Sequence, residues 1–293
     1  MANDLYSNVT ARILQSLEAG IAPWVKPWSA TPGRNVPLNV ISGKAYQGVN
    51  AILLWGNSGR FATPHYLTYK QALDLGGHVR KDETGFQICK VLQLISKPKD
   101  GSTDQDGRAF STMKFFTVFN VDQCEGLPAR VLETPEYKPN HTDERDATID
   151  EFIAATGANF SETGGDRAFY SSGADCVRMP TFDSFKSAAL FYSTSFHELG
   201  HWTGHASRCN REFGKRFGDK QYAAEELVAE LTSAFLCAEF NIDGNLQHAD
   251  YIGNWAALLK EDAKAFFTAA SAAQKAADYL RRAALADNIP LAA

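Results

Sequence analysis

FHELGHWTGH, residues 196–205, holds three of the chain's seven histidines. Within it, His197, Glu198 and His201 form the pattern HExxH. On a helix, positions four apart lie on one face, so both imidazoles can bind the same ion. Glu198 lies beside them, where its carboxylate can act as acid and base on water rather than bind the ion. The stretch predicts a helix carrying a metal site. The alternative is a histidine-rich surface helix, which the apolar residues of the same stretch disfavour.

Two histidines hold a metal ion weakly, so a third ligand is required, and a later stretch supplies candidates. In YAAEELVAEL, residues 222–231, Glu226 and Glu230 lie four apart on one helical face. We expect Glu226 to be the third ligand and Glu230 to orient a ligating histidine through its second ring nitrogen. The reverse assignment stays open. Glu225 is expected to point elsewhere, and His205 to lie at the helix end.

The ligand types predict zinc, although nitrogen and oxygen donors also accept manganese or cobalt. A zinc ion with three protein ligands keeps one position for water and lowers the pKa of that water to about 7. A general base beside such a site can direct water onto a carbonyl group. We therefore interpret the pattern as that of a zinc-dependent metallopeptidase.

Composition separates the two halves of the chain. The 293 residues are 44% hydrophobic and carry a net charge of −5. Residues 1–100 hold 11 lysines and arginines against 6 acidic residues, so the front is basic and the remainder acidic. No stretch has the pattern of a secretory signal or a membrane span, and five scattered cysteines fit reduced thiols. We expect a cytoplasmic protein with no membrane partner.

Periodicity predicts an α+β fold in two domains. Helical spacing covers residues 4–19, 43–55 and 63–77, and strands are expected at residues 86–97 and 113–123. A proline-containing, charged segment at residues 131–146 is interpreted as a linker between domains 1–130 and 147–293. The second domain is expected to be mostly helical with a small sheet. Its last helical segment is expected at residues 247–286.

Aromatic, basic and amide side chains alternate in the front half. This pattern suits a binder of single-stranded DNA, because aromatic faces stack on bases while cations follow phosphates. The opposing interpretation is that the aromatic residues belong to the core. The candidate contacts are Trp24, Lys26, Trp28, Arg34, Lys44, Tyr46 and Asn50.

With both halves considered, the chain resembles the ArdC-type antirestriction proteins of conjugative plasmids. The front resemblance rests on NDLYSNVTARILQSLEAGIAPWVKPW (3–28) and GKAYQGVNAILLW (43–55). The rear resemblance rests on SFHELGHWTGH (195–205), RCNREF (208–213) and YAAEELVAEL (222–231). Cys209 departs from the aliphatic residue expected at its position.

This resemblance implies a single-stranded-DNA-binding domain followed by a zincin-type metallopeptidase domain. It also implies that His197 and His201 are metal ligands, that Glu198 is the catalytic acid and base, and that a glutamate of EELVAE is the third ligand. The implied role is protection of incoming plasmid DNA from host restriction during conjugation. As our own hypothesis, a host protein is the peptidase substrate. The alternatives are a DNA-coating protein with a structural metal and a primase-accessory domain.

Overall fold

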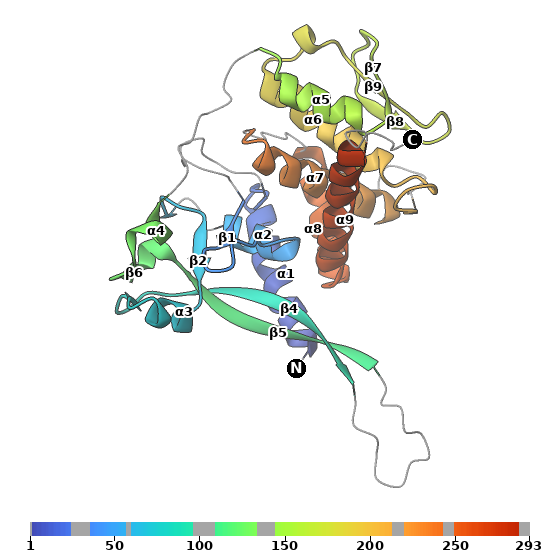
Figure 1. The fold of residues 1–293 in the computed structure, drawn as a ribbon. Helices are drawn as coiled ribbons and strands as arrows, with labels where there is room; N and C mark the ends of the chain where they lie inside the picture. Colours follow the sequence, from blue (N-terminus) through green and yellow to red (C-terminus); the bar gives the residue numbers. More distant parts are fainter. Residues whose placement is uncertain are drawn as a thin grey trace.

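The computed structural model describes residues 2–24, 36–56, 60–95, 109–133, 144–212, 220–242 and 249–286. A front part built on a small sheet, with a long two-stranded ribbon projecting from it, lies beside a mostly helical rear part (Figure 1). The predicted α+β class with two parts is confirmed. No helix among the described residues is both long enough and apolar enough to cross a bilayer.

The front part is organised around a four-stranded sheet of order β1-β2-β5-β4. Its ribbon is an antiparallel pair in which Lys90 faces Lys114, and strands β3 and β6 form a separate pair. The front elements are α1 (Ala2–Glu18), β1 (Leu38–Asn39), α2 (Val49–Trp55), β2 (His65–Leu67), α3 (Tyr69–Asp74), β3 (His78–Val79), β4 (Phe86–Ile95), β5 (Ala109–Asn120), the 3-10 turn Val121–Gln123, β6 (Cys124–Glu125) and α4 (Ala129–Leu132).

The rear part packs a three-stranded sheet of order β7-β9-β8 beside a helical bundle. Helices α6 and α7 form the centre of this part, and α9 packs along α7 (Figure 1). The rear elements are α5 (Ala147–Ala155), β7 (Asn159–Glu162), β8 (Phe169–Ser171), β9 (Cys176–Met179), the 3-10 turn Phe182–Ser184, α6 (Ala188–Trp202), α7 (Lys220–Glu239), α8 (Ala249–Glu261) and α9 (Ala265–Ala286).

Two predicted helices differ from the observed elements because polar side chains redirect the backbone. The segment 63–77 begins with strand β2, and α3 starts only after Thr68, whose side chain accepts a hydrogen bond from the Gln71 N–H in a capping box. The alanine-rich tail forms two helices. Asp262 lies between them and accepts a hydrogen bond from the N–H of Lys264, which favours a new helix start over continuation.

The N-terminal helix belongs to the core of the rear part. Ile13, Leu17 and Trp24 are buried in the same hydrophobic cluster as Trp255 and Phe266 of helices α8 and α9. The Trp24 ring lies 5.4 Å from the Trp255 ring and 5.9 Å from the Phe266 ring, centroid to centroid. The two parts therefore share one core across their junction, while the boundaries at 130 and 147 stay a prediction.

Candidate metal centre

Helices α6 and α7 approach each other closely at one glycine. The Ser187 hydroxyl caps α6 by accepting from the N–H of Leu190, which sets the start of the helix. A Cβ atom added at Gly200 would lie 3.0 Å from the Cα atom of Ala229 on α7. Because no side chain intervenes there, the histidine face of α6 lies against the glutamate face of α7.

The predicted ligand atoms converge at this contact. The Nε2 atoms of His197 and His201 lie 3.1 Å apart. Glu226 places one carboxylate oxygen 3.4 Å from the His197 Nε2 atom and the other 3.6 Å from the His201 Nε2 atom. One ligand atom from each of these three residues lies within 4.8 Å of the others. Two nitrogens and a carboxylate on a pair of rigid helices form a donor set suited to a divalent cation.

The remaining ring nitrogens of both histidines face other carboxylates of α7. The His197 Nδ1 atom lies 3.6 Å from Glu230, and the His201 Nδ1–H donates to Glu225 at 3.2 Å. With a metal ion bound, the ring protons would lie on these Nδ1 atoms, and both Nε2 lone pairs would be directed at the same point. Acceptors that face one another require a cation between them, so the residues present fit a metal ion.

Sequence reasoning missed three residues of the centre. The expectation that Glu225 points elsewhere is wrong, because its carboxylate contacts His201 and is held by Arg211 through two hydrogen bonds of 2.7 and 2.9 Å. Arg211 also donates to the carbonyl oxygen of Gly200. On the other side, the Trp24 indole N–H donates to Glu230 at 3.3 Å. The RCNREF stretch was the only sequence signal that could have pointed to Arg211.

The electrostatics of the centre favour positive charge. Burial acts to lower the pKa of His197, but its contacts with Glu226 and Glu230 outweigh burial and raise that pKa to about 10. The pKa of His201 is raised to about 9 in the same way, by Glu225 and Glu226 acting against burial. Burial acts to raise the pKa of Glu226, yet the two histidines hold it well below its usual range. Carboxylates that attract protons this strongly would also attract a metal cation.

A cavity of about 430 Å³ gives access to the centre. Glu198, 8% exposed, lines it beside both histidines. The hydroxyl groups of Tyr222 and Tyr251 lie 3.1 Å apart and line the same cavity. Strand β8, at the edge of the rear sheet, forms another wall. The cavity therefore combines a cation site, a carboxylate and an open strand edge. His205 lies beyond the end of α6 and contacts Ser207.

Unlike the predicted metal ligands, the predicted DNA contacts that the structure describes are not brought together at one site. Trp24 is only 4% exposed, so its predicted place on a DNA-binding surface is wrong. Its large apolar ring gains more by packing against Trp255 and Phe266 than it would on the surface. Lys26, Trp28 and Arg34 lie outside the described residues.

The other three predicted DNA contacts lie in the described front part. Lys44 is exposed, and Tyr46 is partly buried with its ring edge against Tyr66. The Asn50 side chain exchanges two hydrogen bonds with the backbone of Cys89, donating at 2.7 Å and accepting at 2.8 Å. Asn50 thus pairs with strand β4 as a neighbouring strand would. A role of these three residues in DNA binding stays a prediction.

Two family models match the chain in the order of its two parts. The model described as the N-terminal domain of anti-restriction factor ArdC matches residues 3–119. The model described as a zincin-like metallopeptidase matches residues 147–272, which include His197, His201 and Glu226.

Solved structures and curated proteins also resemble the chain. The metal-free antirestriction ArdC protein from plasmid R388 is 38% identical, with a TM-score of 0.82 over 97% of this chain and 98% of that one. Its Mn(II)-bound structure gives a TM-score of 0.77. Protein y4eC of Sinorhizobium fredii is 34% identical over 287 residues and 91% of its length. A DNA primase TraC of Escherichia coli is 37% identical over 291 residues, but the chain spans only 27% of that primase and 19% of a second one.

Proposed function

The chain belongs to the ArdC family of antirestriction proteins, and on that premise we propose that it protects incoming plasmid DNA from restriction in a recipient bacterium. In this proposal the protein binds single-stranded DNA and also hydrolyses a peptide bond at a metal centre in its zincin-like domain. The peptide substrate is proposed to be a host protein. The observation that carries the catalytic half is the convergence of two histidines and a glutamate beside Glu198.

We assign His197, His201 and Glu226 as the metal ligands. Glu226 is favoured over Glu230 because its oxygens lie near both Nε2 atoms, whereas Glu230 lies near the opposite side of the His197 ring. A divalent cation bound there would act as a Lewis acid, lowering the pKa of water and polarising a carbonyl oxygen. Zinc, manganese and cobalt all suit this donor set, and one structure of the R388 relative is Mn(II)-bound.

The other residues of the cavity would move the proton and position the peptide. Glu198 would accept a proton from water at its carboxylate and deliver it to the nitrogen of the leaving amine. Glu230 and Glu225 would hold the two imidazoles in the orientation that directs both Nε2 atoms at one point. The edge of strand β8 could pair with an extended peptide through its backbone, which favours a protein substrate over a small molecule.

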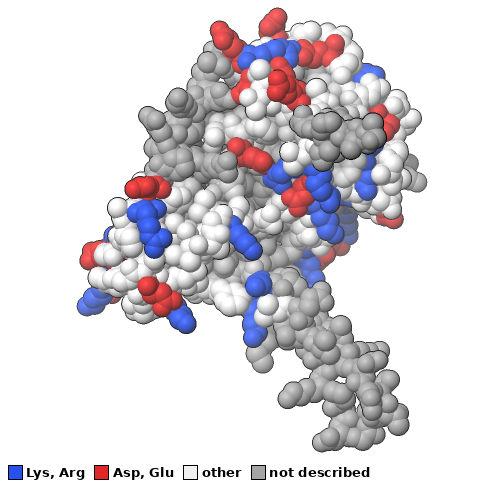
Figure 2. Space-filling model, in the orientation of Figure 1, with Lys and Arg blue, Asp and Glu red and all other residues white. Residues whose placement is uncertain are grey.

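The DNA-binding half is supported by the basic front part and its ribbon. Lys90 and Lys114 are exposed and face each other across β4 and β5. Like charges in direct opposition destabilise a strand pair unless an anion lies between or above them. Figure 2 shows lysine and arginine side chains near the base of this ribbon, and both basic and acidic side chains on the face toward α9. Phosphate groups would be suitable partners for this surface.

A Glu198→Gln variant tests the catalytic half. The substitution keeps the shape of the side chain and removes its ability to accept a proton, so we expect protection of plasmid DNA during conjugation to be lost. Metal content and affinity for a single-stranded oligonucleotide should stay at the wild-type level. Glu151→Gln, an exposed position on α5, serves as the matched control and should protect fully.

Full protection by Glu198→Gln would instead favour a DNA-coating protein with a structural metal. In that outcome, metal removal by a chelator should lower thermal stability without changing oligonucleotide affinity. The TraC match covers too small a part of those primases to favour primase activity here.

A further inference from the structure

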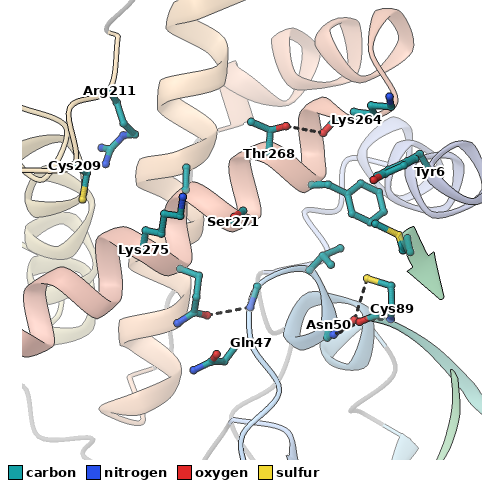
Figure 3. A pocket seen from close by; sticks show the side chains of 16 residues that line it. Tyr6, Gln47, Asn50, Cys89, Cys209, Arg211, Lys264, Thr268, Ser271 and Lys275 are labelled. Atoms are coloured by element: carbon teal, nitrogen blue, oxygen red, sulfur yellow. Dashed lines mark hydrogen bonds between the residues drawn. The ribbon is translucent and has the colours of Figure 1, made fainter. Parts of the chain in front are cut away.

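A second, larger cleft lies between the front and rear parts of the molecule. Its volume is about 690 Å³, and its walls come from α1, the start of α2, strands β4 and β5, the segment after α6, and α9 (Figure 3). The protein carries a net charge of −5, yet the lining of this cleft, within the described part of the chain, includes three cationic side chains and no carboxylate. The cations are Lys264, Lys275 and Arg211.

Helix α9 presents a polar stripe along the cleft. Lys264, directly before the helix, and Thr268, Ser271 and Lys275 within it recur at helical spacing and are all exposed, so they follow one face of the helix. This stripe extends over about 16 Å of helix. Among the residues that the structure describes, neither lysine forms an ion pair with a carboxylate. Two unneutralised cations with hydroxyl groups between them form an extended surface for an anion.

The opposite walls add groups that suit bases and sugars. The Tyr6 ring packs edge-on against Phe267 at 4.7 Å between centroids, and the Lys264 ammonium lies 5.5 Å from the centre of the Tyr6 ring. Gln47 is exposed at the rim of the cleft. Figure 3 shows Gln47 and Asn50 across the cleft from the α9 stripe. Aromatic rings beside cations and amides are characteristic of sites that bind single strands.

We propose that this cleft binds the backbone of a single-stranded polynucleotide, with Lys264, directly before α9, and Lys275 of α9 contacting its phosphates. The proposal rests on the proposed DNA-binding function and deepens it, because it places part of the nucleic-acid path on the rear part. The cleft is open and elongated along α9, which suits a continuous strand better than a single free nucleotide.

The back of the cleft connects directly to the metal centre. Arg211 lines the cleft and holds Glu225, whose other contact is the ring of His201. Because Arg211 also donates to Gly200 and to the hydroxyl of Thr203, its position is fixed by the end of α6. A strand bound in the cleft would therefore lie one side chain away from the residues that orient a metal ligand.

The double variant Lys264→Gln/Lys275→Gln tests the proposal by fluorescence anisotropy with a labelled 20-nucleotide oligo(dT). Each lost phosphate contact should lower the slope of log affinity against log salt by about 0.7, so the slope should fall by about 1.4. If the affinities converge at 1 M salt, the variant binds about 25-fold more weakly at 0.1 M. The control is Lys220→Gln/Lys260→Gln, which changes the net charge equally at lysines paired with Glu261 and Glu18, outside the cleft.

The outcomes separate this inference from the function on which it rests. If the cleft variant binds more weakly and with a smaller salt slope, while the control variant binds as the wild type does, the result supports binding in the cleft. Equal binding by all three proteins overturns the cleft and leaves DNA binding elsewhere on the protein. No binding by the wild type overturns both. Displacement of the oligonucleotide by dAMP at equal nucleotide concentration would identify a mononucleotide site and overturn the polynucleotide proposal.

Discussion

Trp24 connects the first segment of the chain to a group that orients His197. Its indole N–H donates to Glu230, and Glu230 faces the His197 ring nitrogen that points away from the proposed ion. Partners of this kind fix ligand orientation, and their loss commonly weakens metal affinity about 10- to 100-fold. We therefore expect Trp24→Phe, which keeps an aromatic ring but loses the donor, to weaken metal binding about tenfold by titration calorimetry.

The neighbouring tryptophan provides the control for this change. Trp255 is buried in the same core at 1% exposure, and its indole nitrogen has no hydrogen-bond partner in the described part of the chain. Trp255→Phe should reduce thermal stability as Trp24→Phe does, but it should leave metal affinity unchanged. Equal metal affinities of the two variants would show that the Trp24 hydrogen bond does not support the centre.

The choice between Glu226 and Glu230 as third ligand has a direct test. Glu226→Gln removes the carboxylate that lies near both Nε2 atoms, so stoichiometric metal should be lost on elemental analysis. Glu230→Gln removes only a contact to the Nδ1 side of His197 and should weaken affinity about 10- to 100-fold. The opposite order of severity would make Glu230 the ligand.

The sequence could predict which residues share a face of one helix. It could not predict contacts between residues that are distant in sequence and meet only in the fold. His197, Glu198 and His201 are related by helical geometry alone, as are Glu226 and Glu230, so their faces follow from spacing. The Trp24–Glu230 contact joins residues 206 positions apart, and no local pattern encodes it. Glu225 differs from Glu226 by one position, and its contacts with His201 and Arg211 become visible only in the folded structure.

At the scale of elements, the separation between α6 and α7 depends on Gly200. A methyl group there would lie 3.0 Å from the Ala229 Cα atom and 3.3 Å from the Thr232 Cβ atom. Overpacking of this kind costs about 1–3 kcal/mol, whereas replacing a helical glycine recovers about 1 kcal/mol. We expect Gly200→Ala to lower the free energy of unfolding by up to about 2 kcal/mol and to weaken metal binding, because it moves the ligands of α6 away from Glu226.

Gly253 on α8 is the matched helical glycine. It is exposed, and a Cβ atom there would meet nothing within 4 Å. Gly253→Ala should raise the free energy of unfolding by about 1 kcal/mol and leave metal affinity unchanged in denaturation and calorimetry experiments. If Gly200→Ala and Gly253→Ala had the same stability and the same metal affinity, the close-packing explanation would be contradicted.

Elements with strong periodicity were predictable, and those defined by a cap or a pairing partner were not. The strands of the ribbon and helix α7 follow from their own apolar patterns. Strand β2 has only three residues and exists because it pairs with β1 and β5. The division between α8 and α9 depends on Asp262, a single side chain within an otherwise helix-favouring segment.

At the scale of the whole molecule, the shared core should hold the two parts together without the segment between them. Ile13, Leu17 and Trp24 are each less than 5% exposed within the shared cluster, and α1 packs against α8 of the rear part. Full burial of an apolar side chain contributes about 1.5–3 kcal/mol, so three such side chains contribute roughly 4.5–9 kcal/mol before the entropic cost of association. We expect residues 1–133 and 144–293, expressed as two separate chains in one cell, to copurify as a 1:1 complex.

Apolar burial in the core, rather than surface ion pairs, should hold this complex together. The effect of salt on the complex distinguishes these two explanations. A contact stabilised by apolar burial should survive 1 M salt on gel filtration, where exposed ion pairs such as Lys260–Glu18 are screened. Replacing Leu17 by aspartate in the first chain should separate the chains, because it places an unpaired charge in the core. Replacing the exposed Glu18 by alanine should leave the complex intact. Wild-type chains that elute separately at low salt would show that the two parts are independent domains meeting only through their linker.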